Sequence, residues 1–302
     1  MKNTHLQHPE DSILTGDLSV LDWFLSDGKV SAKIDGAPAI VWGTNPQTGK
    51  FFVGTKSVFN KKLIKINETH SDIDRNHSGN VADILHHCFD CLPSFDGIVQ
   101  GDFIGFGGDD TFCPNTITYI FDEVIDQQII IAPHTLYATD GEMKDAYVIN
   151  DVISFDDTES CKFVQPECWQ IDEDFDEIVA FTRQMSCMCE FLTPKQSILV
   201  QKQLNACIRE GFPVDDITQD AIADENDIDV NVLRLWSLVK SIKDDMLFLM
   251  RNNGPKAYID DKQCGGEGYV KINEFGMFKL VNREVFSHAN FNSGLMSTRG
   301  VA

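Results

Sequence analysis

The sequence has no long apolar run. No stretch of about 18 uncharged apolar residues occurs, so no membrane-spanning helix is expected. Residues 1–5 are polar and lack the apolar stretch of a signal peptide. With 302 residues and 42% hydrophobic residues, the chain is long enough for one large domain or two modest ones. We therefore expect a folded cytoplasmic protein that does not enter a membrane.

Basic residues are scarce. Lys and Arg number 25 against 47 Asp and Glu, which gives a formal net charge of −22. Contacts to nucleic acid phosphates need Lys and Arg, so this balance argues against a surface that is basic throughout. A local basic groove stays compatible with the composition.

The nine cysteines show no framework spacing. An odd number without a signal peptide indicates reduced thiols. His86–Cys91 resembles half of a zinc site, but Cys187 and Cys189 do not supply the second pair that such a site needs. Buried thiols on helices are the expected outcome, with a structural zinc as the alternative.

Hydrophobic periodicity divides the chain into strand-rich and helix-rich parts. A helix is expected at 18–25, with Asp17 as N-cap, and a hairpin at 39–54. Residues 67–80 read as a loop. Residues 171–252 show helical spacing, for example at Ile198, Leu199 and Leu204. Other expected elements are a helix at 81–91 and strands at 30–34, 97–105, 116–121, 128–132, 147–154, 162–164, 268–272 and 277–281.

These elements predict an α+β fold with mixed, mostly antiparallel sheets. The absence of regular strand–helix alternation argues against a Rossmann-type sheet. We expect one domain formed by residues 1–170 and 253–302, interrupted by an acidic helical insertion at 171–252.

Lys33-Ile34-Asp35-Gly36 is the pattern that points to chemistry. A lysine at a strand end before a tight turn holds its amine in place, and alternation puts Lys33 and Asp35 on one side. Gly36 lets a ligand approach the backbone. An amine attacks phosphorus only when unprotonated, which requires desolvation or a nearby cation. The alternative is a hairpin turn with a surface ion pair.

The residue order resembles the covalent nucleotidyltransferases, which include ATP-dependent RNA and DNA ligases and mRNA capping enzymes. Lys33–Gly36 looks like their motif I, and Gly266–Val270 is similar to motif IV. Weaker similarities cover Gly54–Ser57, Val99–Gly105 (motif III), Tyr119–Asp122 (the aromatic motif) and Met277–Val281 (motif V). Together they extend over about 250 residues.

The resemblance implies an ATP-grasp-like, DNA-ligase-type nucleotidyltransferase fold and a covalent lysyl-AMP on Lys33. It implies that Lys279 neutralises the α-phosphate, that Phe121 stacks on adenine, and that Asp102 hydrogen-bonds the ribose. The implied cofactors are ATP and Mg²⁺ or Mn²⁺, with the metal held by Glu267 and Asp102; Asp35, Gly36 and Lys56 complete the nucleotide site. The alternatives are a core aromatic at Phe121 and a surface lysine at Lys279.

Three departures from the family pattern concern the phosphate contacts. Asp102 stands where motif III usually has Glu, and Lys279 is the only lysine of the motif V strand. Ala37-Pro38-Ala39 occupies the stretch where an arginine often follows motif I. Lys56, Lys61 or Lys62 are candidate substitutes. The 21 residues after Val281 leave no room for the OB domain of DNA ligases and capping enzymes.

The whole chain also resembles an RNA-ligase-like family of large tailed phages, a resemblance that supplies no activity but would place the protein in the host cytoplasm. The similar segments are 5–11, 35–39, 114–117, 132–135 and 278–283. His8 and His134 fall in them as candidate functional residues. For each histidine, a structural, hydrogen-bonded role is the alternative.

Three functions follow as hypotheses. The first is an ATP-dependent polynucleotide ligase whose partner is a nucleic acid with a 5′-phosphate or polyphosphate end, RNA in preference to DNA. The second keeps the lysyl-AMP chemistry but transfers AMP to a protein or small molecule, since an acidic surface repels polyanions. The third is a catalytically silent phage interaction protein, motivated by the missing lysine and arginine. The oligomeric state is left open.

Overall fold

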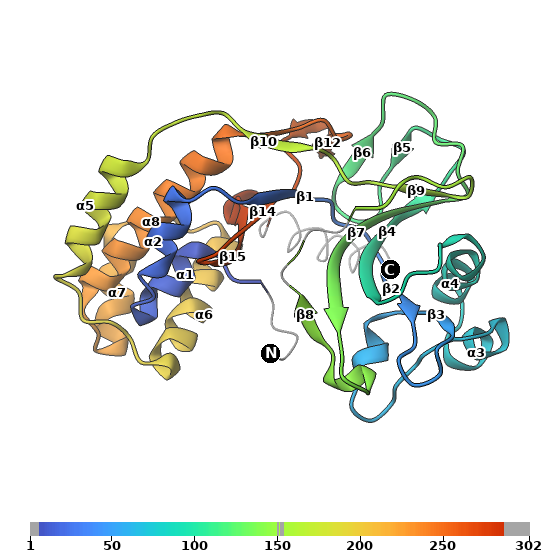
Figure 1. Ribbon diagram of the computed structural model, residues 1–302. Helices are drawn as coiled ribbons and strands as arrows, with labels where there is room; N and C mark the ends of the chain where they lie inside the picture. Colours follow the sequence, from blue (N-terminus) through green and yellow to red (C-terminus); the bar gives the residue numbers. More distant parts are fainter. Residues whose placement is uncertain (1–5, 150, 152–153, 287–302) are drawn as a thin grey trace, which may run out of the picture. The chain divides into compact units, whose positions relative to one another are not determined.

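The computed structural model describes residues 6–149, 151 and 154–286 (Figure 1). The chain forms two compact units. The sheet unit contains, among the described residues, the segments Lys33–Glu167 and Asn253–Gly266. The helical unit contains Leu6–Ala32, Cys168–Asn252 and residues 267–286.

A six-stranded sheet forms the centre of the sheet unit, with strand order β3-β2-β4-β7-β8 and β9 paired to β7. All these pairings are antiparallel except that of β7 with β9. The hairpin predicted at 39–54 is confirmed, because β2 pairs with β3. The strands are β2 (Ala39–Thr44), β3 (Phe51–Gly54), β4 (Ile98–Phe106), β7 (Ile129–Ala138), β8 (Tyr147–Ile149) and β9 (Cys161–Phe163).

The two faces of this sheet carry different side chains. On one face, Trp42, Val99 and Ile131 pack against α4 (Asn80–Cys91) and α3 (His70–Asn76) in a core without water access. On the other face, Val41 and Tyr137 pack against the short 3₁₀ helices η2 (Lys56–Phe59) and η3 (Met143–Asp145). Strand alternation therefore sends Gln100 and Asp102 of β4 to the same face as Ile98 and Tyr137.

A second, four-stranded sheet of the sheet unit has the order β13-β12-β6-β5. Tyr119 of β6 is completely buried and pairs with Ala257 of β12. The strands are β5 (Thr111–Phe112), β6 (Thr118–Ile120), β12 (Lys256–Ile259) and β13 (Lys262–Cys264).

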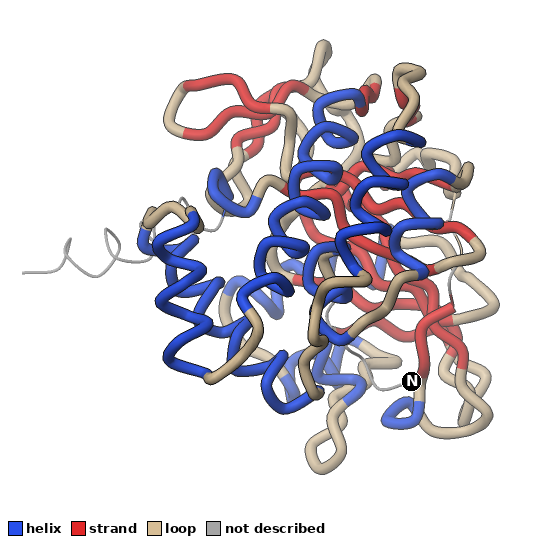
Figure 2. The backbone as a smooth tube through the Cα atoms, turned by 90° about the vertical axis from the view of Figure 1, so that its left-hand side faces the viewer, coloured by secondary structure: helices blue, strands red, loops and turns tan. Residues whose placement is uncertain are grey.

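The helical unit gathers its helices around one apolar core, and they run beside one another in both views (Figures 1 and 2). Trp23, Val239 and Trp236 are fully buried in that core. Thr193 caps the helix Pro194–Glu210 through a reciprocal capping box with Gln196. The helices are α1 (Pro9–Ser12), η1 (Ile13–Thr15), α2 (Ser19–Leu25), α5 (Asp176–Ser186), α6 (Pro194–Glu210), α7 (Asp216–Asn226) and α8 (Val230–Leu249).

A three-stranded sheet, β1-β14-β15, lies against this core. Its strands are β1 (Lys29–Lys33), β14 (Gly268–Asn273) and β15 (Gly276–Val281), and β10 (Cys168–Gln170) pairs separately with β11 (Met250–Asn252). Val30 and Ala32 of β1 and Phe278 and Leu280 of β15 contact the core. Alternation therefore turns Lys279 to the opposite face of β15, away from the helices.

Buried charges join the beginning and the end of the helical unit. The Glu10 carboxylate, which has no exposed surface, accepts hydrogen bonds from Lys243 Nζ at 2.9 Å and Arg283 at 3.2 Å. Arg283 also donates to Asp11 at 2.9 Å, and the Trp236 indole donates to the same Asp11 oxygen at 3.0 Å. Burial favours the neutral carboxyl group, but the two cations outweigh it and lower the pKa of Glu10.

The structure differs from the predicted domain boundaries. Segment 168–252 is close to the expected 171–252, but the contacts group it with residues 6–32 and 267–286 rather than setting it apart as an insertion. The reason is that α2, β14 and β15 bury Trp23, Tyr269 and Leu280 in the same core as α8. Sequence periodicity does not reveal which distant segments share a core.

One local prediction was wrong. Residues 67–80 contain α3 rather than a loop, because Thr69 caps the helix by accepting a hydrogen bond from the Asp72 backbone. On α6 the buried face is Val200, Leu204 and Ile208, while Ile198 and Leu199 are exposed. Of the strand expected at 147–154, β8 covers Tyr147–Ile149, and residues 150, 152 and 153 lie outside the described residues.

Within the described ranges, no helix is both long and apolar enough to cross a bilayer.

The His8 imidazole lies beside the buried charges of the helical unit. Within the described part of the chain, its Nδ1 is buried without a hydrogen-bond partner. Burial, together with the positive charges of Arg283, Lys279 and Lys243, lowers the pKa of His8 far below its ordinary value. The folded protein therefore holds His8 neutral, although Glu10 Oε1 is 3.8 Å away.

This lowered pKa predicts a loss of stability in mild acid. Below about pH 6.5 the unfolded chain protonates His8 and the folded chain does not. The free energy of unfolding therefore falls by up to about 1.4 kcal/mol for each further pH unit of acidification. Urea unfolding at pH 5.5 and 7.5 should show that His8→Gln removes this component. The same substitution at the exposed His87 is the control, and an unchanged pH slope in His8→Gln would contradict the prediction.

Candidate functional site

Lys33 ends β1, and its amine is held by the turn that follows. Lys33 Nζ lies 3.4 Å from Asp35 Oδ1, and the two side chains are 30% and 33% exposed. The other carboxylate oxygen, Asp35 Oδ2, accepts a hydrogen bond from Asn115 Nδ2 at 2.7 Å. The Asp35 backbone N–H donates to the hydroxyl of Tyr119 at 2.9 Å. The ion pair expected for a simple surface turn is present, but it is half-buried and anchored to two other segments.

The same turn packs tightly onto β4. The Ala37 backbone N–H donates to the Phe103 carbonyl at 3.0 Å, and the Phe103 N–H donates to the Pro38 carbonyl at 3.1 Å. A Cβ atom on Gly36 would lie 2.4 Å from that Phe103 carbonyl oxygen, closer than atoms can approach. Gly36 is therefore required by the contact between the Lys33 turn and β4.

A second polar group lies on β4 and β7. Asp102 pairs in register with Ala39, three residues beyond Gly36. Its Oδ1 is 3.6 Å from His134 Nε2, and the Gln100 amide is 3.4 Å from the same nitrogen. Tyr137 donates to Gln100 Oε1 at 2.9 Å, so the group is internally bonded. These polar side chains occupy the sheet face opposite α3 and α4.

A β-bulge places His134 in this group. Gln100 pairs with Thr135 but Gly101 pairs with Pro133, so His134 is the extra residue of β7. A bulge of this kind redirects a side chain, and the interruption of pairing also tolerates Pro133, which has no N–H to donate. His134 thus faces Asp102 because of the bulge, with its Nδ1 2.6 Å from the Thr135 hydroxyl.

The remaining predicted residues lie on other elements. Phe121 follows β6 and packs edge-on against Phe112, with ring centroids 5.7 Å apart. Lys56 is exposed on η2. Glu267 and Lys279 belong to the helical unit: Glu267 directly precedes β14 between two glycines with positive φ, and the Lys279 N–H donates to the Gln7 carbonyl at 3.1 Å. The metal contact implied for Glu267 stays a prediction.

The cysteines behave as buried or isolated thiols. Cys88 and Cys91 are buried on α4, and burial raises the pKa of both thiols. Among the described residues, no group of three or more His, Cys, Asp and Glu side chains is arranged to hold a metal ion. A metal held by one or two carboxylates together with substrate phosphates would not require such a group.

Comparison with known proteins places the chain in a family. The model of a family of unknown function, DUF6267, matches residues 3–219 and 214–294. The chain belongs to the DUF6267 family. No curated protein and no solved structure matches it.

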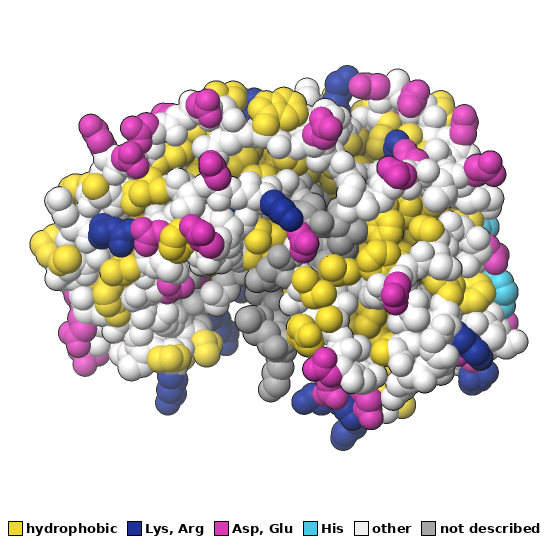
Figure 3. Space-filling model, viewed as in Figure 1, with side chains coloured by type: hydrophobic (Ala, Val, Ile, Leu, Met, Phe, Trp, Pro, Cys, Tyr) yellow, Lys and Arg dark blue, Asp and Glu magenta, His cyan; other side chains and the backbone are white. Residues whose placement is uncertain are grey.

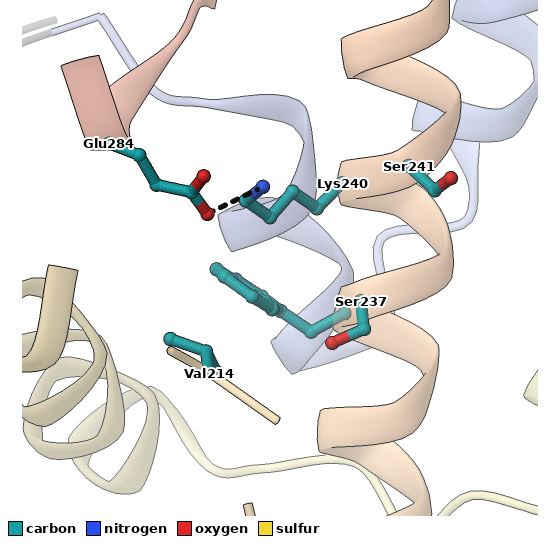
Figure 4. A pocket seen from close by; sticks show the side chains of 6 residues that line it. Val214, Ser237, Lys240, Ser241 and Glu284 are labelled. Atoms are coloured by element: carbon teal, nitrogen blue, oxygen red, sulfur yellow. Dashed lines mark ion pairs between the residues drawn. The ribbon is translucent and has the colours of Figure 1, made fainter. Parts of the chain in front are cut away.

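One pocket of this DUF6267 protein lies away from the predicted site. It measures about 190 Å³ and opens beside α8 in the helical unit (Figure 4). Lys240 points to Glu284 at 3.1 Å and also pairs with Asp244 at 2.7 Å. The Ser237 hydroxyl accepts a hydrogen bond from Gln219. Because its polar groups bind one another and it is smaller than typical ligand sites of about 300–1,000 Å³, we do not assign it a ligand.

Sequence reasoning missed Asn115 and Tyr119 as site residues. Both fall in segments that were singled out, since Asn115 lies in 114–117 and Tyr119 opens the aromatic motif. The aromatic motif instead indicated Phe121, two residues further along the chain, as the site residue. The contact with Asp35 depends on a sequence separation of 80 residues or more, which no local pattern reveals.

The Gly36 contact generates a stability prediction. Gly36→Ala should destabilise the sheet unit by about 1–3 kcal/mol, because the added methyl group forces the turn away from the Phe103 carbonyl. Gly141→Ala is the matched control, since a Cβ there meets nothing within 4 Å. Urea unfolding measures both, and equal stability of the two variants would show that the turn does not pack as described.

Proposed function

We propose that this protein is an ATP-dependent polynucleotide ligase, acting on RNA in preference to DNA, that carries AMP on Lys33. One observation carries the proposal: the amine of the motif-like lysine lies at a strand end beside the Asp35 carboxylate, to which Asn115 donates a hydrogen bond, while the Asp35 backbone N–H donates to Tyr119. An ordinary surface lysine gains nothing from such an arrangement. A nucleophile does, because orientation of the attacking atom lowers the barrier.

The proposed step is a displacement at the α-phosphorus of ATP. The Lys33 ammonium gives up a proton, which Asp35 Oδ1 is within reach to accept. The neutral amine forms the N–P bond, the bond from the α-phosphorus to the bridging oxygen breaks, and pyrophosphate leaves. A second proton leaves the nitrogen to solvent, which yields the phosphoramidate.

Other residues would bind the nucleotide. In this proposal Asp102, 13% exposed on its sheet face, binds the ribose. Lys279, turned away from the helices, neutralises charge on the α-phosphate. Glu267 with Asp102 would hold Mg²⁺ or Mn²⁺, for which carboxylate oxygens are suitable ligands, and the ion would screen the phosphates. The ligase-type fold is part of the proposal; the α+β architecture with mostly antiparallel sheets is compatible with it.

A different acceptor is the second candidate. The net charge of −22 disfavours a polyanion and favours a basic protein as the recipient of AMP. Sealing of nicked RNA and DNA substrates, in parallel with mass spectrometry of adenylated products in lysate, distinguishes the two. Adenylated enzyme without any sealed polynucleotide would leave only the second candidate.

Covalent labelling tests the central claim. Incubation with α-³²P-ATP and Mg²⁺ should give a protein label that withstands denaturing electrophoresis and disappears in Lys33→Ala, because the phosphoramidate needs that amine. Lys29→Ala, on the exposed start of the same strand, should keep the label. GTP and NAD in parallel define the nucleotide.

Lys271 is the most informative second control. Burial lowers its pKa to about 8, so a larger fraction of this lysine is unprotonated at neutral pH than of an ordinary one. It lies 5.2 Å from the Trp23 ring and faces the helical core. The proposal expects Lys271→Met to keep the label. A label that survives Lys33→Ala and is lost in Lys271→Met would refute the assignment.

The hydrogen bond between Asp35 and Tyr119 generates a further prediction, for which a second buried tyrosine is the control. Tyr119 and Tyr137 are both buried; the Tyr119 hydroxyl accepts from the Asp35 N–H of the Lys33 turn, whereas the Tyr137 hydroxyl donates to Gln100. Tyr119→Phe should slow adenylation roughly 10- to 100-fold by loosening the turn. Tyr137→Phe should cost a similar 0.5–1.5 kcal/mol or so of stability and leave the rate of labelling nearly unchanged. Equal rates in the two variants would argue against the positioning role.

A further inference from the structure

Residues 50–65, the lysine segment, carry a local charge opposite to that of the chain. The segment contains Lys50, Lys56, Lys61, Lys62 and Lys65, and no Asp or Glu occurs from residue 50 to residue 66. The whole chain has a net charge of −22. A local concentration of positive charge on an otherwise acidic protein attracts a partner of opposite charge.

Three of these lysines are available to a partner. Lys50 pairs with Glu68 at 3.6 Å, and Lys65 donates to the Asn76 carbonyl at 2.6 Å. The other three, Lys56, Lys61 and Lys62, are exposed and form no ion pair within the described part of the chain. The adjoining η3 brings acidic neighbours, of which Glu142 is already paired with Lys144.

The segment is a folded part of the sheet unit and not a solvated tail. Val58 is fully buried against the sheet, and the Thr55 hydroxyl caps η2 by accepting from the Ser57 N–H. The Lys65 N–H donates to the Ser57 carbonyl at 3.4 Å. Val53 and Asn67 exchange backbone hydrogen bonds, which closes the segment at its base. The free lysines therefore project from a fixed backbone, so a bound strand would not pay for ordering it.

The strand register relates the segment to Lys33. Gly54, at the end of β3, is paired with Val41 near the start of β2. In an antiparallel hairpin the end of one strand lies beside the start of the other. Gly54 thus lies at the end of the hairpin where the turn from Lys33 enters it, and the residues that follow in η2 pack beside η3.

Apolar side chains accompany the lysines. Leu63 is 73% exposed and Ile64 41%. In Figure 3, Lys and Arg side chains gather at the lower end of the sheet unit, together with several acidic side chains. Ammonium groups beside exposed apolar side chains fit a single strand, whose phosphates need cations and whose unpaired bases offer apolar faces.

We propose that the lysine segment is the docking surface for the phosphodiester backbone of a single-stranded polynucleotide. The surface itself follows from charge and exposure. That the bound strand is the acceptor of AMP rests on the proposed function. The phosphates would contact Lys56, Lys61 and Lys62, and the bases would lie against Leu63 and Ile64.

The salt dependence of RNA binding tests the surface. Fluorescence anisotropy with a 5′-phosphorylated, dye-labelled single-stranded RNA is measured over a range of KCl concentrations, with single-stranded DNA in parallel. The triple variant Lys56→Gln/Lys61→Gln/Lys62→Gln should lower the slope of log K against log salt by about 2, because each phosphate contact contributes about 0.7. At low salt, the affinity of this variant for single-stranded RNA and for single-stranded DNA should fall below that of the wild-type protein. A preference for RNA would appear as a higher affinity of the wild-type protein for RNA than for DNA.

A second triple variant matches the change in charge elsewhere. Lys195→Gln/Lys202→Gln/Lys262→Gln removes three exposed lysines outside the segment and should leave slope and affinity unchanged. If both triple variants lost RNA affinity equally, the loss would come from the change in net charge and not from the segment, which would overturn the proposal. Binding to anionic phospholipid vesicles in place of RNA, lost in the first variant, would overturn it as well.

Labelling separates this proposal from the proposed function. The triple variant of the lysine segment, which also removes Lys56 of the implied nucleotide site, should lose sealing of RNA. A wild-type protein that binds RNA through the segment yet takes no label refutes the ligase and leaves the docking surface standing. If the wild-type protein takes the label but the triple variant binds RNA as tightly as the wild type, the docking surface alone is refuted.

Discussion

The Asp35 carboxylate is the contact around which the sheet unit arranges its candidate chemistry. One oxygen faces the Lys33 amine, and the other is held by Asn115. Asn115 donates to this carboxylate and Tyr119 accepts from the Asp35 N–H, so the turn, the segment before β6 and β6 itself meet at one place. Gly36 and the Phe103 carbonyl complete this constraint, because only a residue without a side chain lets the turn lie on β4. The position of Lys33 thus depends on segments up to 84 residues away.

The helical unit depends on a different constraint, the burial of charge. Glu10 and Lys243 have no exposed surface and compensate each other, with Arg283 as a second cation. Buried ion pairs of this kind contribute little net stability, but removal of one partner is strongly destabilising. They therefore keep the N-terminal segment, α8 and the residues after β15 in register. Burial, together with the positive charges, lowers the pKa of His8, which the sequence suggested as functional, and holds it neutral.

The acidic composition and the ligase proposal are compatible because charge is distributed unevenly. Net charge governs long-range repulsion, whereas a strand is bound by the few groups it touches. In the proposal, the lysine segment supplies such groups, because Lys56, Lys61 and Lys62 are exposed on it. Affinity would then be salt-sensitive, and the acidic remainder of the surface would disfavour non-specific binding.

The sequence by itself determined the local elements and the residue types of the site. The alternation at 39–54 and 97–105 predicted β2, β3 and β4, and the Lys33–Gly36 pattern predicted an ion pair at a strand end. For Lys33–Gly36 the ion pair was the alternative to a nucleophilic lysine. These features depend on neighbours within a few residues, which periodicity records. Only the tertiary structure decided that Asn115 and Tyr119 hold Asp35, that a bulge turns His134 toward Asp102, and that α8 shares a core with α2 and β15. Those contacts join distant segments, and their free energy comes from burial and hydrogen-bond satisfaction in the folded chain, which no local pattern encodes.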